Sequence, residues 1–187
     1  MTSSRATIDP RKKRTRDELL AAFFKLVLSR SYHEIRIADL LSESGVSRST
    51  FYEHFAGKEE LLCASIEGPF LILAGMVCKE SSTRQVEGLL EHFWKNRALA
   101  RTLFQGVAHR ALRRKLISVI ESRLDNCTRS KLRIPRRLVA NALADGMFSP
   151  IVAWILGEAS CTASHLAVAL QRSTAASVDA FSFGSTA

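Results

Sequence analysis

Residues that interrupt helices are scarce in this chain. Only 4 prolines and 9 glycines occur in 187 residues, whereas proteins built from short strands need both residue types in their many turns. No segment repeats with a period of about 20–50 residues, so the chain is not a solenoid. Hydrophobic residues make up 47% of the chain, which argues against a disordered protein. The composition therefore favours an all-helical protein with a sizeable core.

Cysteine is also rare, and no two cysteines are spaced as metal ligands. Cys63, Cys78, Cys127 and Cys161 form no C-x-x-C pair, and no paired histidine motif accompanies them. We therefore expect neither a metal site nor a disulfide framework, but buried, reduced thiols. No apolar run follows the basic N-terminus, and the apolar window at residues 151–156 is too short to span a bilayer. These absences predict a cytoplasmic protein.

Motifs of the common enzyme classes are missing as well. The sequence has no H-E-x-x-H, no glycine-rich phosphate loop, no G-x-S-x-G and no paired carboxylates on one predicted helix face. Each of these motifs would fix a metal, a phosphate or a nucleophile at a defined point. We therefore expect a protein that is not an enzyme and that requires no cofactor.

Acidic residues are outnumbered by basic ones, 18 to 27, so the formal net charge is +9. The excess has two centres, one in residues 1–16 and one in residues 97–137. Positive charge permits nucleic-acid binding without proving it. The second centre is compatible with a ligand site and equally with a solvated face.

The first basic centre contains the run Arg11 to Arg14, which reads RKKR. We expect the first helix to start after this run, with Thr15 as its N-cap. Lys12, Lys13 and Arg14 would then lie along DNA phosphates or in a minor groove. The alternative is a solvated tail.

One stretch from Arg36 to Leu62, RIADLLSESGVSRSTFYEHFAGKEELL, organises the rest of the chain. Its apolar residues follow helical spacing up to Gly45, where a left-handed residue would end a helix. Ser47 is suited to cap a second helix, on which Phe51 and Phe55 can both face inward. Two short helices joined by a tight turn, with a polar outer face on the second, indicate a helix-turn-helix.

Within this stretch, I-A, G-V-S, T-F-Y-x-H-F and K-E-E-L resemble the DNA-binding signature of the tetracycline-repressor (TetR) family of bacterial regulators. The resemblance covers roughly the first third of the chain; the remainder matches the family only in length and helical character. It implies an all-α fold of about nine helices, in which a three-helix DNA-binding domain precedes an effector-binding and dimerisation domain. We expect a tail at 1–10, the DNA-binding domain at 11–57 and the second domain at 58–187.

The second helix of the motif carries the candidate DNA contacts. Arg48 is the best candidate for reading a base, because its guanidinium can bond guanine O6 and N7 together. The resemblance implies that Tyr52 and Lys58 contact phosphate. Each of these side chains could instead complete the packing of a small domain or remain solvated. The predicted DNA-binding residues are Arg36, Ser47, Arg48, Ser49, Thr50, Tyr52, His54, Lys58, Lys12, Lys13 and Arg14.

The resemblance further implies a cavity for a small-molecule effector in the second domain. The candidate lining residues are Phe70, Met76, Phe93, Trp94, Leu103, Phe104, Arg113 and Leu116. Aromatic residues at helical spacing more often form a core than a pocket. An arginine turned inward, from among Arg101, Arg110, Arg113 and Arg114, would favour an anionic effector. Gly68-Pro69 should kink or break the helix that connects the two domains.

A lone helix-turn-helix needs a second copy to bind specifically, so we expect a homodimer on a near-palindromic DNA operator with half-sites about 34–36 Å apart. The resemblance places the dimer contact on the last two helices, 135–157 and 162–178. These helices contain small residues suited to close packing, or simply good helix formers: Ala144, Gly146, Ala153, Ala159, Ala163, Ala167, Ala169 and Ala175. The resemblance implies a bacterial, nucleoid-associated repressor released by its effector. The alternatives are a non-specific basic DNA-binding protein and a helical interaction module.

Overall fold

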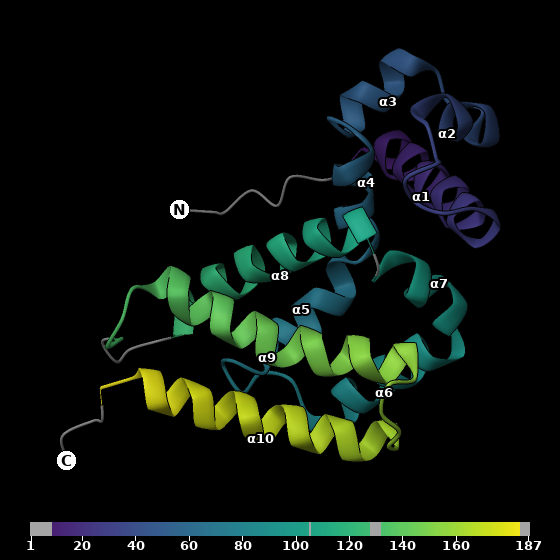
Figure 1. Cartoon of the computed structure of the whole chain (residues 1–187). Coiled ribbons are helices and arrows are strands. Elements are labelled where there is room, and N and C mark those ends of the chain that lie inside the picture. Colours follow the sequence, from purple (N-terminus) through teal and green to yellow (C-terminus); the bar gives the residue numbers. More distant parts are fainter. Residues whose placement is uncertain (1–8, 105, 128–131, 184–187) are drawn as a thin grey trace, which may run out of the picture. The chain divides into compact units, whose positions relative to one another are not determined.

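The computed structural model describes residues 9–104, 106–127 and 132–183, and within these ranges the chain forms ten α-helices and no strand longer than an isolated bridge (Figure 1). The predicted all-α fold is confirmed. The helices gather into two compact units, Met1–Ser65 and Ile66–Ala187, which we call the head and the body. The head therefore includes the helix at Lys58–Ser65, eight residues beyond the expected boundary at 57.

The head consists of α1 (Pro10–Ser29), α2 (Ile37–Ser44), α3 (Arg48–His54) and α4 (Lys58–Ser65). The first helix packs against the other three. Its buried residues share one face and meet those of the shorter helices in a single apolar core. The largest fully buried side chains of the head are Leu19, Phe23, Ile35, Leu40, Phe51, Phe55, Leu61 and Leu62.

The first helix begins at Pro10, five residues before the expected cap at Thr15. Asp9 is the N-cap, and its carboxylate accepts a hydrogen bond of 3.0 Å from the backbone N–H of Arg11. Proline is favourable at the first helical position, because its missing N–H would have no partner there and its φ is already helical. The predicted cap at Thr15 is therefore wrong, and the RKKR run lies inside the helix instead of ahead of it.

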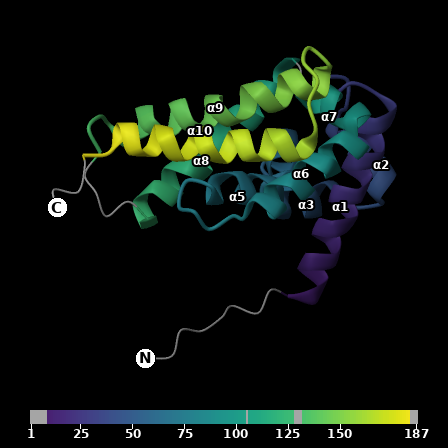
Figure 2. The same cartoon turned by 90° about the horizontal axis from the view of Figure 1, so that it is seen from below.

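The body consists of α5 (Glu67–Gly75), α6 (Thr83–Lys95), α7 (Arg97–Leu103), α8 (Gly106–Cys127), α9 (Arg136–Leu156) and α10 (Ala163–Phe181). The eighth helix packs against α5 and α9, and α10 packs against α6 and α9. The helices α9 and α10 run antiparallel and side by side (Figures 1 and 2). The helix α9 contains nine buried residues and packs against α6, α7, α8 and α10.

The chain passes from head to body through a helix break at Ile66. The predicted interruption at Gly68-Pro69 is close to this point, but Pro69 itself lies in the first turn of α5. A proline ring collides with the carbonyl of the residue four positions earlier in a continuous helix. That residue is Ser65, where α4 ends. The proline therefore explains a break that lies ahead of it in the sequence.

Two expectations from composition need correction. By length and composition alone, α9 could span a membrane, which its short apolar window at residues 151–156 did not suggest. Half of the apolar stretch of α9 is buried within the body, as in a core helix of a folded domain. Cys78 is disulfide-bonded, so the expectation of a reduced thiol is wrong there. Cys161 is free as expected, but it is exposed instead of buried. A disulfide depends on tertiary placement, which cysteine spacing does not reveal.

Candidate nucleic-acid interface

The turn between α2 and α3 forms as its residues predict. Gly45 ends α2 with φ +69°, and its N–H donates to the carbonyl of Leu41 at 2.9 Å. Glycine adopts this left-handed conformation without steric cost. Ser47 caps α3, with its hydroxyl accepting from the backbone N–H of Thr50 at 3.2 Å. Two local signals thus fix the start and the direction of the second helix, and both predictions are confirmed.

The helix α3 has one buried and one exposed face. Phe51 and Phe55 are buried, with ring centroids 6.0 Å apart. Arg48 and Tyr52 lie on the opposite side, and Tyr52 is 46% exposed. The Arg48 guanidinium lies 5.8 Å from the centroid of the Tyr52 ring, a distance compatible with a cation–π contact. A guanidinium and a phenol therefore project together from a helix that is anchored by two phenylalanines.

Hydroxyl groups surround the N-terminus of α3. The Ser47 hydroxyl lies 3.0 Å from that of Ser49 and 2.9 Å from that of Thr50. Ser49 is exposed, Thr50 is half-buried, and His54 is half-buried at the last turn of the helix. Hydroxyls can both donate and accept, so this end of the helix can bond phosphate oxygens or base edges. The six predicted contacts between residues 47 and 54 thus share one short helix and its cap.

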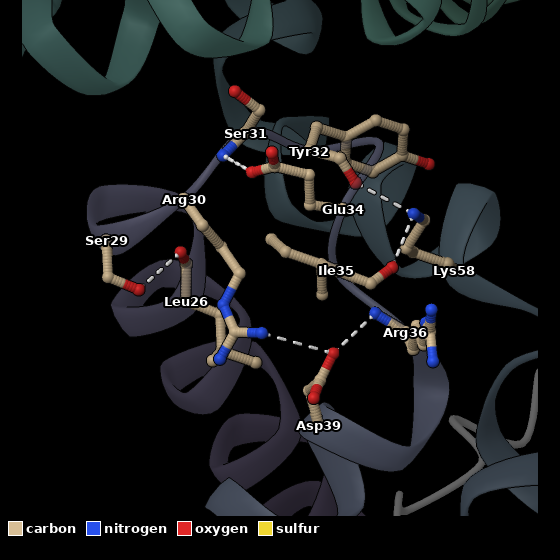
Figure 3. Close-up of polar contacts among 10 residues, drawn as sticks. All are labelled: Leu26, Ser29, Arg30, Ser31, Tyr32, Glu34, Ile35, Arg36, Asp39 and Lys58. Carbon is tan, nitrogen blue, oxygen red and sulfur yellow. Dashed lines mark hydrogen bonds and ion pairs between the residues drawn. The ribbon is translucent and has the colours of Figure 1, made fainter.

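The N-terminus of α2 presents Arg36. Its backbone N–H donates to a carboxylate oxygen of Asp39 at 2.7 Å, and the same carboxylate lies 3.4 Å from the guanidinium of Arg30 (Figure 3). The Arg36 side chain is exposed, and among the described residues its guanidinium has no hydrogen bond or ion pair. Asp39 was missed in the sequence, although an acid three residues after a helix cap is a known local signal.

Lys58 faces the interior of the head instead of the α3 surface. Its ammonium donates to the carbonyls of Tyr32 and Ile35 at 2.7 and 2.6 Å and lies 4.4 Å from the centroid of the Tyr32 ring (Figure 3). Burial lowers the pKa of Lys58, against an opposing effect of the Asp39 carboxylate. Burial, aided by Glu59, raises the pKa of Tyr32 to about 12. Two of the three ammonium donors are therefore occupied, and the predicted phosphate contact depends on the third.

Replacing Lys58 by methionine tests whether this side chain mainly holds the head together or mainly contacts phosphate. Methionine keeps an unbranched apolar stem but leaves two half-buried carbonyls without their charged donor. We expect the head to lose about 1–3 kcal/mol of unfolding free energy, measured by hydrogen exchange of the head amides. A lost phosphate contact would also reduce the slope of log affinity against log salt by about 0.9. Lys12→Met is the control for an exposed lysine; equal stability of the two variants would contradict the clamping role.

The basic run occupies the first turns of α1. Lys12 and Lys13 are exposed, and Arg14 forms an ion pair of 2.9 Å with Glu18 in which both side chains remain largely exposed. Exposed pairs of this kind contribute little to stability, so Arg14 could exchange Glu18 for a phosphate at small cost. All three cations are carried on one helix.

The predicted effector residues are mostly packed into the core of the body. Phe70, Met76, Phe93, Leu103, Phe104 and Leu116 are buried, whereas Trp94 is 40% exposed. The rings of Phe93 and Phe104 meet edge to face at 5.5 Å, and Phe148 contacts Phe104 at 5.3 Å in the same way. Arg113 is the member of the predicted set that lines a hollow of about 210 Å³.

This hollow, which we call the α8–α9 hollow, is lined by His109, Arg113, Asp145, Phe148, Ser149, Val152, Ala153 and Glu158. Arg101 does not line it; its guanidinium donates to the carbonyls of Ile155 and Leu156 at 3.0 and 3.3 Å and so caps the C-terminus of α9. Cations are favourable at that end of a helix. The lining residues come from two helices and a loop that are far apart in the sequence, which explains why most of them escaped prediction.

Comparison with known proteins gives matches of two kinds. Residues 19–64 match the family model described as "Bacterial regulatory proteins, tetR family". The uncharacterized HTH-type transcriptional regulator YxbF of Bacillus subtilis (strain 168) is 43% identical over 61 residues, which are 32% of this chain and 16% of that protein. The HTH-type dhaKLM operon transcriptional activator DhaS of Lactococcus lactis subsp. lactis (strain IL1403) is 36% identical over 56 residues, 30% of each chain. The matched region thus spans less than a third of either curated relative.

A solved structure extends the likeness beyond the head. The TetR transcriptional regulator from Streptococcus agalactiae 2603V superposes with a TM-score of 0.54 and 22% sequence identity, over 88% of this chain and 95% of that one. At this identity the likeness concerns the fold alone. The superposition includes the body, whose sequence carries no recognisable motif.

Proposed function

Because the chain belongs to the TetR family of bacterial regulators, we propose that it is a sequence-specific DNA-binding transcriptional regulator and not an enzyme. It would act in the bacterial cytoplasm, on the nucleoid. The observation that carries the proposal is the exposed face of α3, where Arg48 and Tyr52 project from a helix held by Phe51 and Phe55. A rigid helix with such a face fits the major groove.

We propose that Arg48 reads a base and that the residues around it bind phosphate. The guanidinium of Arg48 can bond guanine bidentately, whereas Ser47, Ser49, Tyr52 and His54 surround it with donors suited to phosphate. Arg36 would add a contact from the start of α2, and Lys12 and Lys13 would add charge from α1. Phosphate contacts fix the register on DNA, and base contacts supply the sequence preference.

The regulator would act as a homodimer through α9 and α10. Leu138, Ala142 and Gly146 are exposed on α9, and Val168 and Ala169 are exposed on α10. Small and apolar exposed residues on two antiparallel helices suit a four-helix contact with a second copy. Of the small residues predicted for this contact, Ala144 and Ala167 are buried within the protomer and so belong to its own core.

We propose repression relieved by a small-molecule effector bound in the body. The effector would favour a conformation in which the two heads no longer match successive major grooves, and DNA affinity would fall only as far as the effector prefers that state. One relative, DhaS, is an activator, so the sign of regulation requires its own measurement, a reporter gene with the operator placed over the promoter.

Selection of DNA from a random library with the purified protein tests the proposal. A specific regulator should enrich a near-palindrome with half-sites about 10 base pairs apart, or a multiple of that spacing. A non-specific basic protein would enrich no sequence and would be displaced equally by any competitor DNA. A helical interaction module would retain no DNA.

Replacing Arg48 by alanine should weaken binding to the selected operator by about 1–3 kcal/mol, because a bidentate contact to one base is lost. Specificity at one base pair of each half-site should relax, which a gel shift with singly substituted operators measures. The exposed side chain makes no buried contact, so the thermal stability should not change. Unchanged affinity and specificity would exclude Arg48 as a reader of bases.

A further inference from the structure

The α8–α9 hollow combines an aromatic floor with charged walls. Phe148 lines it and meets Phe104 and Phe70 edge to face at 5.3 and 6.3 Å, so the ring is held in place from behind. Val152 and Ala153 add apolar surface, and the volume of about 210 Å³ suits a small molecule. The chemistry of a ligand then depends on which polar groups of the walls remain available.

Arg113, the cation that lines the hollow, already has partners. Arg113 donates to both carboxylate oxygens of Asp145 at 2.6 Å and to the side-chain oxygen of Asn141 at 3.2 Å. Hydrogen bonding to Asp145 raises the pKa of Arg113, so this side chain stays charged and paired. The guanidinium of Arg101 is directed to the last carbonyls of α9. Among the described residues that line the hollow, none therefore offers an incoming anion an unoccupied guanidinium.

The acceptors of the hollow, by contrast, are open. The Nδ1 of His109 lies 3.0 Å from the carbonyl oxygen of Phe104, so Nδ1 donates to that carbonyl and Nε2 is the ring nitrogen left to accept a hydrogen bond whenever it carries no proton. The backbone N–H of Glu158 donates to Ala153 at 3.0 Å, which fixes the loop. Within the described ranges, neither the Glu158 carboxylate nor the Ser149 hydroxyl has a hydrogen bond or an ion pair.

From this distribution we propose that the α8–α9 hollow binds a small organic amine in its protonated form. The ammonium group donates to the carboxylate of Glu158 and to Nε2 of His109, while the hydrocarbon part rests on Phe148 and Val152. The aromatic floor favours a cation further. The claim that such an amine is the effector rests on the proposed function. The claim that the hollow binds an amine is independent of it.

Calorimetric titration of the full chain with three ligands of equal length tests the chemistry. We expect n-hexylamine to bind about tenfold or more tightly than hexan-1-ol, because a hydrogen bond from a charged donor is stronger than one from a neutral hydroxyl, and hexanoate to bind least. Equal binding of amine and alcohol, tighter binding of hexanoate, or no binding of the amine would each overturn the proposal.

A pair of variants locates the site. Glu158→Gln removes the charge but keeps the shape and should weaken hexylamine binding at least about tenfold. Glu91→Gln, at an exposed position of α6 outside the hollow, makes the same change elsewhere and should leave binding unaltered. Unchanged binding by Glu158→Gln, or equal losses in the two variants, would place the amine elsewhere and refute the assignment.

The operator assay separates this proposal from the regulatory one. If hexylamine binds and DNA affinity falls, the amine site and the proposed release of the regulator by its effector are both supported. If it binds and DNA affinity is unchanged, the site stands and effector release through it is overturned. If the amine does not bind while the operator does, the site is refuted and the DNA-binding regulator remains.

Discussion

Replacing Phe51 by alanine is expected to unfold the head while the body remains folded. The Phe51 ring is fully buried and contacts both Phe55 and Tyr52. Loss of such a ring destabilises a core by about 3–5 kcal/mol, which approaches the whole stability of many small domains. Circular dichroism should show a partial loss of helix at room temperature, and operator binding should disappear.

Tyr52→Phe separates folding from contact in the same helix. It keeps the ring against Phe51 and removes a hydroxyl from an exposed side chain, so the helix content should equal that of the wild type. Operator affinity should fall only modestly, as for one phosphate contact. A Phe51→Ala protein with full helix content and normal DNA binding would contradict the view that this ring holds the reading helix.

Gly146→Arg is expected to abolish specific operator binding by separating the dimer. Among the described residues of the protomer, nothing lies within 4 Å of a Cβ placed at Gly146. Arginine is also a better helix former than glycine, so the protomer should fold normally. An arginine side chain would, however, obstruct close contact of α9 with a second copy. Two linked heads can exceed the affinity of one by about 10²–10⁴-fold, and a loss of this size is expected in a gel shift.

The matched control for this change is Gly88→Arg. Gly88 is exposed on α6, and no described residue lies within 4 Å of a Cβ placed there. The added charge and the gain in helix propensity are the same, so non-specific attraction to DNA rises equally in both variants. Analytical ultracentrifugation should find the Gly88 variant dimeric and the Gly146 variant monomeric. Dimers in both would move the interface away from the exposed face of α9.

The helix α3 was predictable because its signals are local. Gly45 and Ser47 form hydrogen bonds with backbone groups that lie within four residues of them. The helix ends that they define can therefore be predicted from the local sequence alone. The spacing of Phe51 and Phe55 likewise defines one helix face without knowledge of the rest. The family resemblance depended on the same residues.

The remaining features of the sites depend on contacts between distant residues. Lys58 bonds carbonyls 26 and 23 residues away, and Arg113 pairs with Asp145 across 32 residues. No rule of residue spacing predicts such pairs. For Lys58, the family resemblance instead implied a contact with phosphate. The early start of α1 is a different case, since Asp9 and Pro10 form a recognisable cap that the basic run beside them obscured.

The helical state of the RKKR run constrains how it can meet DNA. An α-helix with its side chains is about 10–12 Å across, whereas the minor groove of B-DNA is only about 6 Å wide. Successive side chains also diverge by roughly 100° around the axis, so Lys12, Lys13 and Arg14 cannot all point at one strand. While this turn stays wound, it can only touch the sugar-phosphate rim from outside. The contribution of this turn to DNA affinity would then not depend on the base sequence, and it would decrease steadily as the ionic strength of the medium rises.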